Sequence, residues 1–295
     1  MHGIRDLLGP FPQRADLEAE TVERMDCGRY VRETVEYTVE TGERVRALVG
    51  VPKGLSEPAP AVFCHHQHNG EFALGKSEVF GLRGDPDQAL AVELADHGFI
   101  TFAPDAVGFE ERNWSNGTNQ TEYFELATRL VVGKTLTAKV LHDASVGLDY
   151  LQTRPDVRRD RLGFIGHSYG GRMALWMPAH DARLRASVSN CGCIDYQHSL
   201  THDTGIQMAF CIPGFMERFE LIDVVDQIRD CHVLISVGAD DKWSRGHRDL
   251  VEGLIARGHE NVELVVHDGD HAFTPTMRTY AYEFLGRWLF GRDQT

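Results

Sequence analysis

Hydrophobic and polar residues alternate along the first part of the chain. Two alternating runs lie between Tyr30 and Val51, and Thr41-Gly42 separates them. A period of two is typical of strands with one buried face, and a glycine between two such runs predicts the turn of a β-hairpin. Residues 1–28, before the hairpin, mix charged and apolar side chains. We expect an N-terminal helical extension there, packed on the body of the protein.

After residue 60 the pattern changes to short apolar runs that alternate with segments of helical spacing. The apolar runs are residues 61–64, 99–103, 162–165, 186–190, 233–237 and 262–266. The segments of helical spacing are residues 89–97, 121–151 with a break at Gly133, and 277–289. Uninterrupted apolar runs are typical of strands buried on both faces, and their alternation with helices predicts βαβ units. The sequence therefore predicts one α/β domain over residues 1–295, with a mostly parallel central sheet, an N-terminal antiparallel hairpin and helices on both faces.

Residues 194–226 interrupt this alternation. Histidine, methionine and phenylalanine are frequent there, and the segment has no strand pattern. It lies between one apolar run and the next, on the side of a parallel sheet where ligands bind. We therefore predict a small cap insertion over these residues.

Composition and charge narrow the class of partner. Of the 295 residues 42% are hydrophobic and 25% are charged, which is typical of globular proteins, and the formal net charge is −14. An acidic surface repels nucleic acids and anionic membranes, so we expect neither as a partner. No apolar run reaches the length of a membrane span, and the first residues lack the apolar core of a signal peptide. We therefore expect a cytoplasmic protein.

The six cysteines are scattered along the chain, and several lie in apolar runs. Cys191 and Cys193 form a close pair, but no second pair follows at the spacing of a zinc site. This pattern favours buried free thiols in a reducing compartment over a structural metal site.

A motif of the form G-x-S-x-G stands out after the apolar run 162–165. Gly166-His-Ser168-Tyr-Gly170 leads directly into Met173-Ala-Leu-Trp176, which has the composition of a helix. A serine on a tight turn between a strand and a helix is a nucleophile elbow, and the glycines two residues away avoid a collision with the turn. A surface serine in a glycine-rich turn is the alternative, but the flanking strand and helix favour a catalytic Ser168.

A nucleophilic serine needs a histidine base and an acid that orients the histidine, and on this kind of sheet the acid and then the histidine follow the elbow. The run 233–237 ends in Asp240-Asp241, and the run 262–266 leads into a loop with His271. We prefer Asp241 to Asp240 as the acid. We prefer His271 to His267 as the base, because His267 still lies in or near the strand.

An oxyanion formed at Ser168 requires backbone N–H donors. The first is expected from Tyr169, and the second from Gln67 or His68 in the loop after the run 61–64. His65, His66 and His68 also suggest a zinc site. No acidic residue or cysteine lies at a helpful spacing for a further ligand. We therefore expect no metal and no other cofactor.

Three of these segments together resemble the α/β-hydrolase superfamily: residues 166–171, Gly238-Ala-Asp-Asp241 and Gly269-Asp-His271-Ala-Phe273. Within it the chain is most similar to the branch of dienelactone hydrolases and acetyl xylan esterases (cephalosporin deacetylases), over residues 60–289. The resemblance implies the fold, the triad and an oxyanion loop in which His68 is the donor residue. The chain departs from the pattern at Gln67, where a glycine is usual, and at Ser168, where true dienelactone hydrolases carry a thiol.

The sequence thus predicts a serine esterase for a small-molecule substrate, either a small acyl or acetyl ester or a lactone. Candidate substrate-binding residues are Met208 and Phe215 in the cap, and Glu110 and Trp114 in an earlier loop. Packing of the cap is an equal alternative for these side chains. An acyltransferase, a cyclase or a serine peptidase would use the same triad, and a binding protein could retain the elbow without catalysis. A homodimer is compatible with any of these functions.

Overall fold

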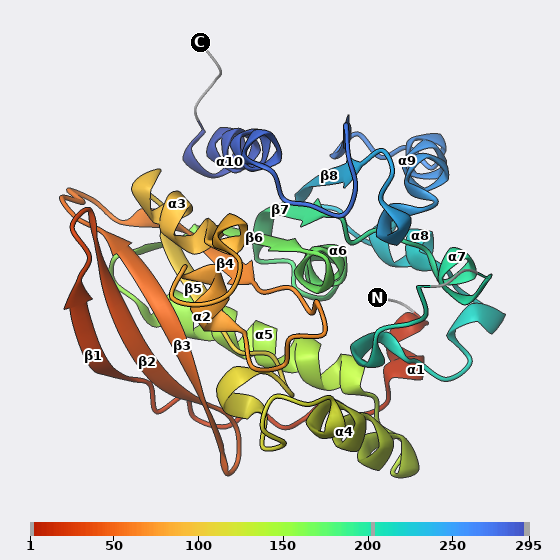
Figure 1. Cartoon of the computed structure of the whole chain (residues 1–295), viewed down its shortest axis with the longest axis horizontal. Coiled ribbons are helices and arrows are strands. Elements are labelled where there is room, and N and C mark those ends of the chain that lie inside the picture. The colour runs from red at the N-terminus through yellow and green to blue at the C-terminus, as the bar shows by residue number, and fades with distance from the viewer. Residues whose placement is uncertain (1–2, 202–203, 292–295) are drawn as a thin grey trace.

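The computed structural model describes residues 3–201 and 204–291, and a twisted sheet runs through its centre (Figure 1). The strands in these ranges are β1 (Glu20–Asp26), β2 (Tyr30–Glu40), β3 (Glu43–Pro52), β4 (Ala59–His65), β5 (Ile100–Pro104), β6 (Val157–His167), β7 (Leu184–Asn190), β8 (His232–Gly238) and β9 (Val262–His267). The α-helices are α1 (Ile4–Leu8), α2 (Lys76–Val79), α3 (Leu90–Asp96), α4 (Gln120–Val131), α5 (Leu136–Thr153), α6 (Tyr169–His180), α7 (Tyr196–Thr201), α8 (Leu221–Val225), α9 (His247–Ala256) and α10 (Pro275–Phe290).

The sheet combines an antiparallel start with a parallel remainder. In the described residues its strand order is β1-β2-β3-β5-β4-β6-β7-β8-β9. Neighbouring strands from β1 to β5 pair antiparallel, whereas β5, β4, β6, β7, β8 and β9 pair parallel. The predicted hairpin is confirmed as β2 and β3, with Gly42 at a φ of 85° in its turn. Because the parallel strands share one direction, their carboxyl ends meet at one edge of the sheet.

The prediction for residues 1–28 is largely wrong. The only described helix in that range is α1, whose Ile4 and Leu8 are buried, and residues 20–26 form the edge strand β1. All seven residues of β1 are exposed, so the strand has no apolar face that a sequence pattern could reveal. Backbone pairing with β2 holds it in place, for example Met25 opposite Arg32. Met1 and His2 lie outside the described residues.

Helices cover both faces of the sheet, as the alternating pattern predicts. On one face α3 and α10 enclose a cluster of buried side chains that includes Leu94 and Leu285. On the other face α5 and α6 pack over a larger cluster that includes Leu148 and Trp176 (Figure 1). The predicted break at Gly133 is also confirmed: its φ is 72°, and it separates α4 from α5.

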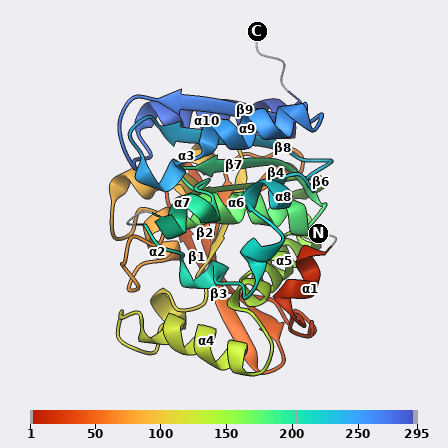
Figure 2. The same ribbon diagram turned by 90° about the vertical axis from the view of Figure 1, so that its right-hand side faces the viewer.

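The segment predicted as a cap has no strand in its described residues, 194–201 and 204–226. It consists of α7, α8 and two short 3₁₀ turns, Met208–Phe210 and Phe215–Glu217. Helix α8 packs against α6, which begins directly after Ser168. Figure 2 shows α7 and α8 on the same face of the molecule as α6. Residues 202 and 203 of the predicted cap lie outside the described part of the chain.

All six cysteines are free thiols, and Cys64, Cys191, Cys193 and Cys231 are buried. Cys27 and Cys211 are half-buried, so the predicted burial holds for four of the six. In the part of the chain that the structure describes, every helix is too short or too polar to span a bilayer.

Candidate active site

Ser168 lies in a strained turn between β6 and α6. Its φ is 57° and its ψ is −111°, a conformation that costs energy in any residue with a side chain. A Cβ atom added at Gly166 would lie 2.4 Å from the carbonyl carbon of Gly170. A Cβ atom at Gly170 would lie 2.4 Å from the carbonyl oxygen of His65. The turn therefore requires both glycines of the motif, and it is the predicted elbow.

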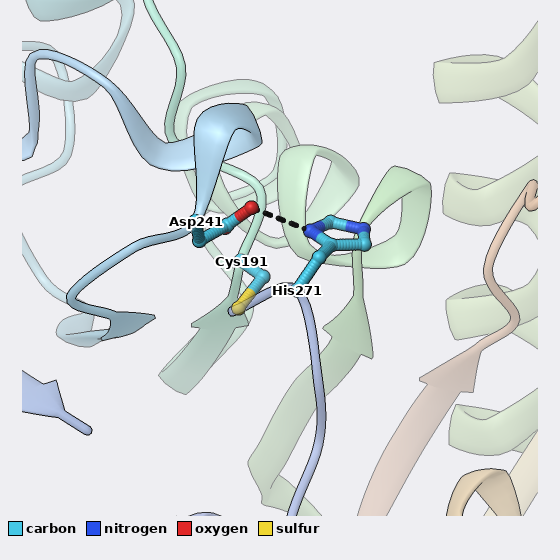
Figure 3. Close-up of side chains that lie close together, drawn as sticks. All are labelled: Cys191, Asp241 and His271. Atoms are coloured by element: carbon cyan, nitrogen blue, oxygen red, sulfur yellow. Dashed lines mark hydrogen bonds and ion pairs between the residues drawn. The ribbon is translucent and has the colours of Figure 1, made fainter. Parts of the chain in front are cut away.

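A hydrogen-bonded pair of Asp241 and His271 lies near this turn (Figure 3). Nδ1 of His271 lies 2.9 Å from Oδ1 of Asp241, which follows β8, and His271 belongs to the loop after β9. The Asp241 side chain is fully buried, and it also accepts hydrogen bonds from the Trp243 N–H and the Ser244 hydroxyl. With Nδ1–H donating to the carboxylate, Nε2 of His271 is the ring nitrogen that can accept a proton.

The environment of Asp241 keeps its carboxylate ionised. Burial by itself raises the pKa of Asp241, but the hydrogen bond and the charge of His271 lower it, as do the bonds from Ser244 and Trp243. The net result is a pKa below the usual value for aspartate. An ionised Asp241 can thus stabilise a positive charge on His271.

The two alternative residues lie elsewhere. Asp240 is exposed, and its backbone N–H donates to the carbonyl of Gly269 at 2.8 Å. His267 remains in β9, where its ring lies edge-on to Tyr280 with ring centroids 6.3 Å apart. The geometry thus pairs the preferred residues, Asp241 and His271.

Ser168 and His271 line one cavity of about 490 Å³. Its other described lining residues are His68, Asn69, Gly70, Phe72, Asn119, Glu122, Thr204, Ile206, Gln207, Met208 and Trp243. The wall is mixed: a carboxylate and several amides alternate with aromatic and aliphatic side chains. The cavity is large enough for a small organic molecule.

His65 and His66, in and just after β4, use their ring nitrogens to fix the backbone of the loop. The His65 Nδ1–H donates to the carbonyl of His66, and the His66 Nδ1–H donates to the carbonyl of Gln67 at 2.7 Å. Nε2 of His66 accepts from the N–H of Ala106 at 3.0 Å. Burial lowers the pKa of His65 to about 3 and that of His66 to about 4. Both rings are therefore neutral at physiological pH, and their role is to hold the backbone of the loop.

Of the two candidate oxyanion residues in this loop, only His68 is one of the described residues that line the cavity. The Gln67 side chain is buried and donates to Glu78 in α2. Gln67 is not one of the described residues that line the cavity. His68 does line it, and its Nδ1 accepts from the N–H of Gly70 at 3.1 Å. Its Nε2–H consequently donates to Glu122, 3.2 Å away. The first residue of α6, Tyr169, has a fully buried ring and is the third candidate.

Three of the four candidate substrate-binding residues do not reach the cavity, and this corrects the sequence-based prediction. Trp114 is 60% exposed and packs edge-on against Phe124. Glu110 accepts from the Lys76 ammonium at 3.0 Å, in a buried ion cluster. Phe215 is buried against Tyr196. These side chains satisfy tertiary contacts that composition does not reveal, and only Met208 lines the cavity.

Sequence patterns also missed residues that shape the site. Asn190, at the end of β7, donates to His167 Nδ1 at 2.8 Å and to the carbonyl of Ala272 at 3.0 Å, and it accepts from the Ser236 hydroxyl. It therefore ties the His271 loop to β6 and β8. Its position, a polar residue at the carboxyl end of a parallel strand, is the signal that could have identified it. Glu122 carries no such signal, because it reaches the cavity from a helix.

Cys191 lies beside Asp241 and His271 (Figure 3). The ligand atoms of the three residues all lie within 4.8 Å of one another, a spacing that metal ligands can adopt. Burial raises the pKa of the Cys191 thiol far above its usual range, and the charge of Asp241 raises it further. In this protonated form the thiol is a poor nucleophile.

Comparisons with known proteins indicate the family of the chain. A family model described as "Dienelactone hydrolase family" matches residues 76–284. A Bacillus subtilis (strain 168) protein named "Putative hydrolase YtaP" is 29% identical over 294 residues, which cover 96% of both chains.

Solved structures show the same fold at lower identity. A "putative acetyl xylan esterase" from Bacteroides fragilis NCTC 9343 has a TM-score of 0.74 at 21% identity, over 90% of this chain and 73% of the other. Acetyl xylan esterase 1 from Thermoanaerobacterium sp. JW/SL YS485 has a TM-score of 0.68 at 17% identity, over 97% of both chains. The family model spans well over half of the sequence and confirms the resemblance. The chain therefore belongs to the dienelactone hydrolase family and is a carboxylic ester hydrolase of the α/β-hydrolase fold.

Proposed function

We propose that Ser168, His271 and Asp241 hydrolyse a carboxylic ester through an acyl-enzyme. The observation that carries the proposal is the 2.9 Å bond between His271 and a fully buried Asp241, in a protein whose Ser168 elbow opens into the same cavity as His271. A histidine oriented by a buried carboxylate can act as a general base for a serine.

In the first half-reaction Nε2 of His271 accepts the proton of the Ser168 hydroxyl as its oxygen attacks the ester carbonyl. Negative charge moves to the carbonyl oxygen, where the backbone N–H groups of Tyr169 and His68 are the proposed donors. The protonated His271 then gives its proton to the leaving alcohol. In the second half-reaction water attacks the acyl-enzyme with the same base, and the acid leaves. No metal or organic cofactor takes part in the proposed steps.

The cavity suits a small, largely uncharged ester or lactone. Among the described residues that line the cavity, Glu122 is the one acidic residue, and none is a lysine or an arginine. Asn119 and Gln207 offer hydrogen bonds, while Phe72 and Trp243 offer apolar surface. We assign the alcohol part of the substrate to this cavity.

The test combines labelling with turnover. A fluorophosphonate probe should label the native chain at Ser168, and the native chain should release acid from phenyl acetate without an added acyl acceptor. Ser168→Ala should lose both properties while its thermal unfolding is unchanged. Labelling at another residue, or full turnover by the variant, would refute the proposed nucleophile. Turnover only with an added alcohol or amine would show an acyltransferase.

A further inference from the structure

A second, smaller pocket shares Ser168 with the main cavity. Its lining includes Arg172, Gly192, Ile194, Gln207 and Trp243. Its volume is about 10 Å³, close to the space of one water-sized group. Ser168, Gln207 and Trp243 line both spaces, so the small pocket lies beside Ser168, the residue that would carry the acyl group.

Arg172 is the charged residue of this pocket. It lies in the first turn of α6, and side chains on a helix lean towards its N-terminus, which here is Ser168. Arg172 is only 4% exposed. Its Nε and Nη2 atoms have no hydrogen-bond partner, and Arg172 forms no ion pair, within residues 3–201 and 204–291. The protein thus keeps a buried guanidinium with unused donors next to the nucleophile.

This arrangement costs stability unless something occupies the pocket. A buried charge without an ionic partner is unfavourable, and the positive end of the α6 dipole adds to the cost. The rings of Tyr196 and Phe210 lie 4.8 Å and 5.3 Å from the guanidinium carbon and offset part of it through cation–π contacts. Rings cover the faces of a guanidinium, whereas N–H donors require an oxygen acceptor at its edge.

Gln207 offers this pocket a hydrogen-bond acceptor, whereas Arg172 offers donors. Its Oε1 atom is buried and accepts no hydrogen bond from the described residues. A group that fits the pocket should therefore accept from Arg172 and donate to Gln207. A hydroxyl does both with one heavy atom, whereas a methyl group does neither.

We propose that this pocket binds the 2-hydroxyl group of the acyl part, so that the enzyme prefers esters of short 2-hydroxy acids. The inference rests on the proposed role of Ser168. In the acyl-enzyme the carbonyl carbon is bonded to the Ser168 oxygen, and the hydroxyl oxygen on the next carbon is two atoms beyond the carbonyl carbon. The pocket beside Ser168 has room for one such atom. The reaction remains hydrolysis: ester and water give a 2-hydroxy acid and an alcohol.

Two substrates isolate the contribution of the hydroxyl. Phenyl glycolate and phenyl propionate have the same leaving group and equal numbers of heavy atoms, and differ by a hydroxyl in place of a methyl. Each kcat/KM is divided by the rate constant for alkaline hydrolysis of that ester, which removes the difference in intrinsic reactivity. We expect the native enzyme to prefer the glycolate at least about tenfold, since a site built for a hydroxyl rejects the isostere without it.

Variants then locate the preference. Arg172→Met keeps an apolar stem against the two rings, and it should bring the glycolate-to-propionate ratio close to unity. Arg172→Lys should give an intermediate ratio, and Gln207→Leu should also reduce it. Thermal unfolding and fluorophosphonate labelling of each variant establish that the fold and Ser168 are intact, and the native ratio stands even if a variant does not fold.

The outcomes separate the two proposals. Equal corrected rates for both esters in the native enzyme would overturn the 2-hydroxyacyl inference and leave Ser168 as the nucleophile. A preference that survives in folded Arg172→Met would also overturn it. If neither ester is hydrolysed and Ser168 is not labelled, the proposed function itself fails.

Discussion

Two loops at the same edge of the sheet carry histidines and use them in opposite ways. At the end of β4 and in the loop after it, His65 and His66 are buried and hydrogen-bonded to the backbone. In the loop after β9, the ring of His271 is 26% exposed and bonded to a buried carboxylate. Only the second arrangement leaves a ring nitrogen facing a cavity beside a strained serine.

The difference shows that the contacts of a ring decide its chemistry. Three histidines lie within four residues at the end of β4 and in the loop after it, yet two of them hold the loop backbone and the third pairs with Glu122. A single histidine after β9 has the partner that base catalysis needs. The following variants test this contrast.

The largest expected effect belongs to His271→Ala. Loss of the proposed base should reduce kcat for phenyl acetate by a factor on the order of 10⁶. His267→Ala, in the same β9 region, should stay within about twofold of the native rate, because its ring lies against Tyr280. Steady-state kinetics with both variants checks the assignment. A comparable loss in the two would contradict it.

Asp241→Asn should reduce kcat by a factor on the order of 10⁴, because an amide cannot hold His271 in the required tautomer or stabilise its charge. Asp240→Asn is the matched control, and its exposed side chain should be dispensable. Circular dichroism should show both variants folded. Equal kinetic losses would make the choice between the two acids wrong.

Glu122→Gln weakens the bond that holds His68 at the cavity wall. Since the backbone of His68 is a proposed oxyanion donor, we expect kcat/KM to fall about tenfold, less than for complete loss of a donor. Glu125→Gln on the same helix removes only an ion pair with Arg129 and should have no effect. An unchanged rate in Glu122→Gln would show that the pairing with His68 does not position the donor.

The smallest effect concerns stability in acid. Burial lowers the pKa of His65, His66 and His167 to between about 3 and 4, from 6.5 in the unfolded chain. Their contribution to stability is present above pH 6.5 and is lost as the pH falls towards the folded values. Each histidine adds at most about 1.4 kcal/mol per pH unit to the slope.

Urea unfolding between pH 7 and pH 5 measures this slope, and the difference between native protein and His65→Gln isolates one of the three groups. The variant should lose less stability on acidification than the native protein. Parallel curves for the two proteins would mean that His65 takes up its proton equally in both states.

Local patterns predicted much of the fold and the pairing of Asp241 with His271. The elbow depends on neighbouring residues: a strand, Ser168 in a left-handed turn, and glycines that the turn requires. Strand ends placed Asp241 and His271 at the same edge, because parallel strands share a direction. Such features can be read from sequence because each is specified within a few residues.

The rest depends on contacts between distant segments. The sequence predicts that Glu110 binds a substrate, but its carboxylate accepts a hydrogen bond from Lys76, which comes from another segment. Phe215 packs inside the cap segment, and β1 owes its structure to the neighbouring strand rather than to any apolar face. Arg172 follows the elbow directly, but its missing partner became apparent only from the fold.

The most direct test of the central claim is mass spectrometry of the enzyme quenched during turnover of phenyl acetate. The account predicts an acetyl group on Ser168 that accumulates in His271→Gln after slow acylation and disappears rapidly in the native enzyme. An acetyl group on any other residue, or steady hydrolysis with Ser168 never acylated in either protein, would contradict it.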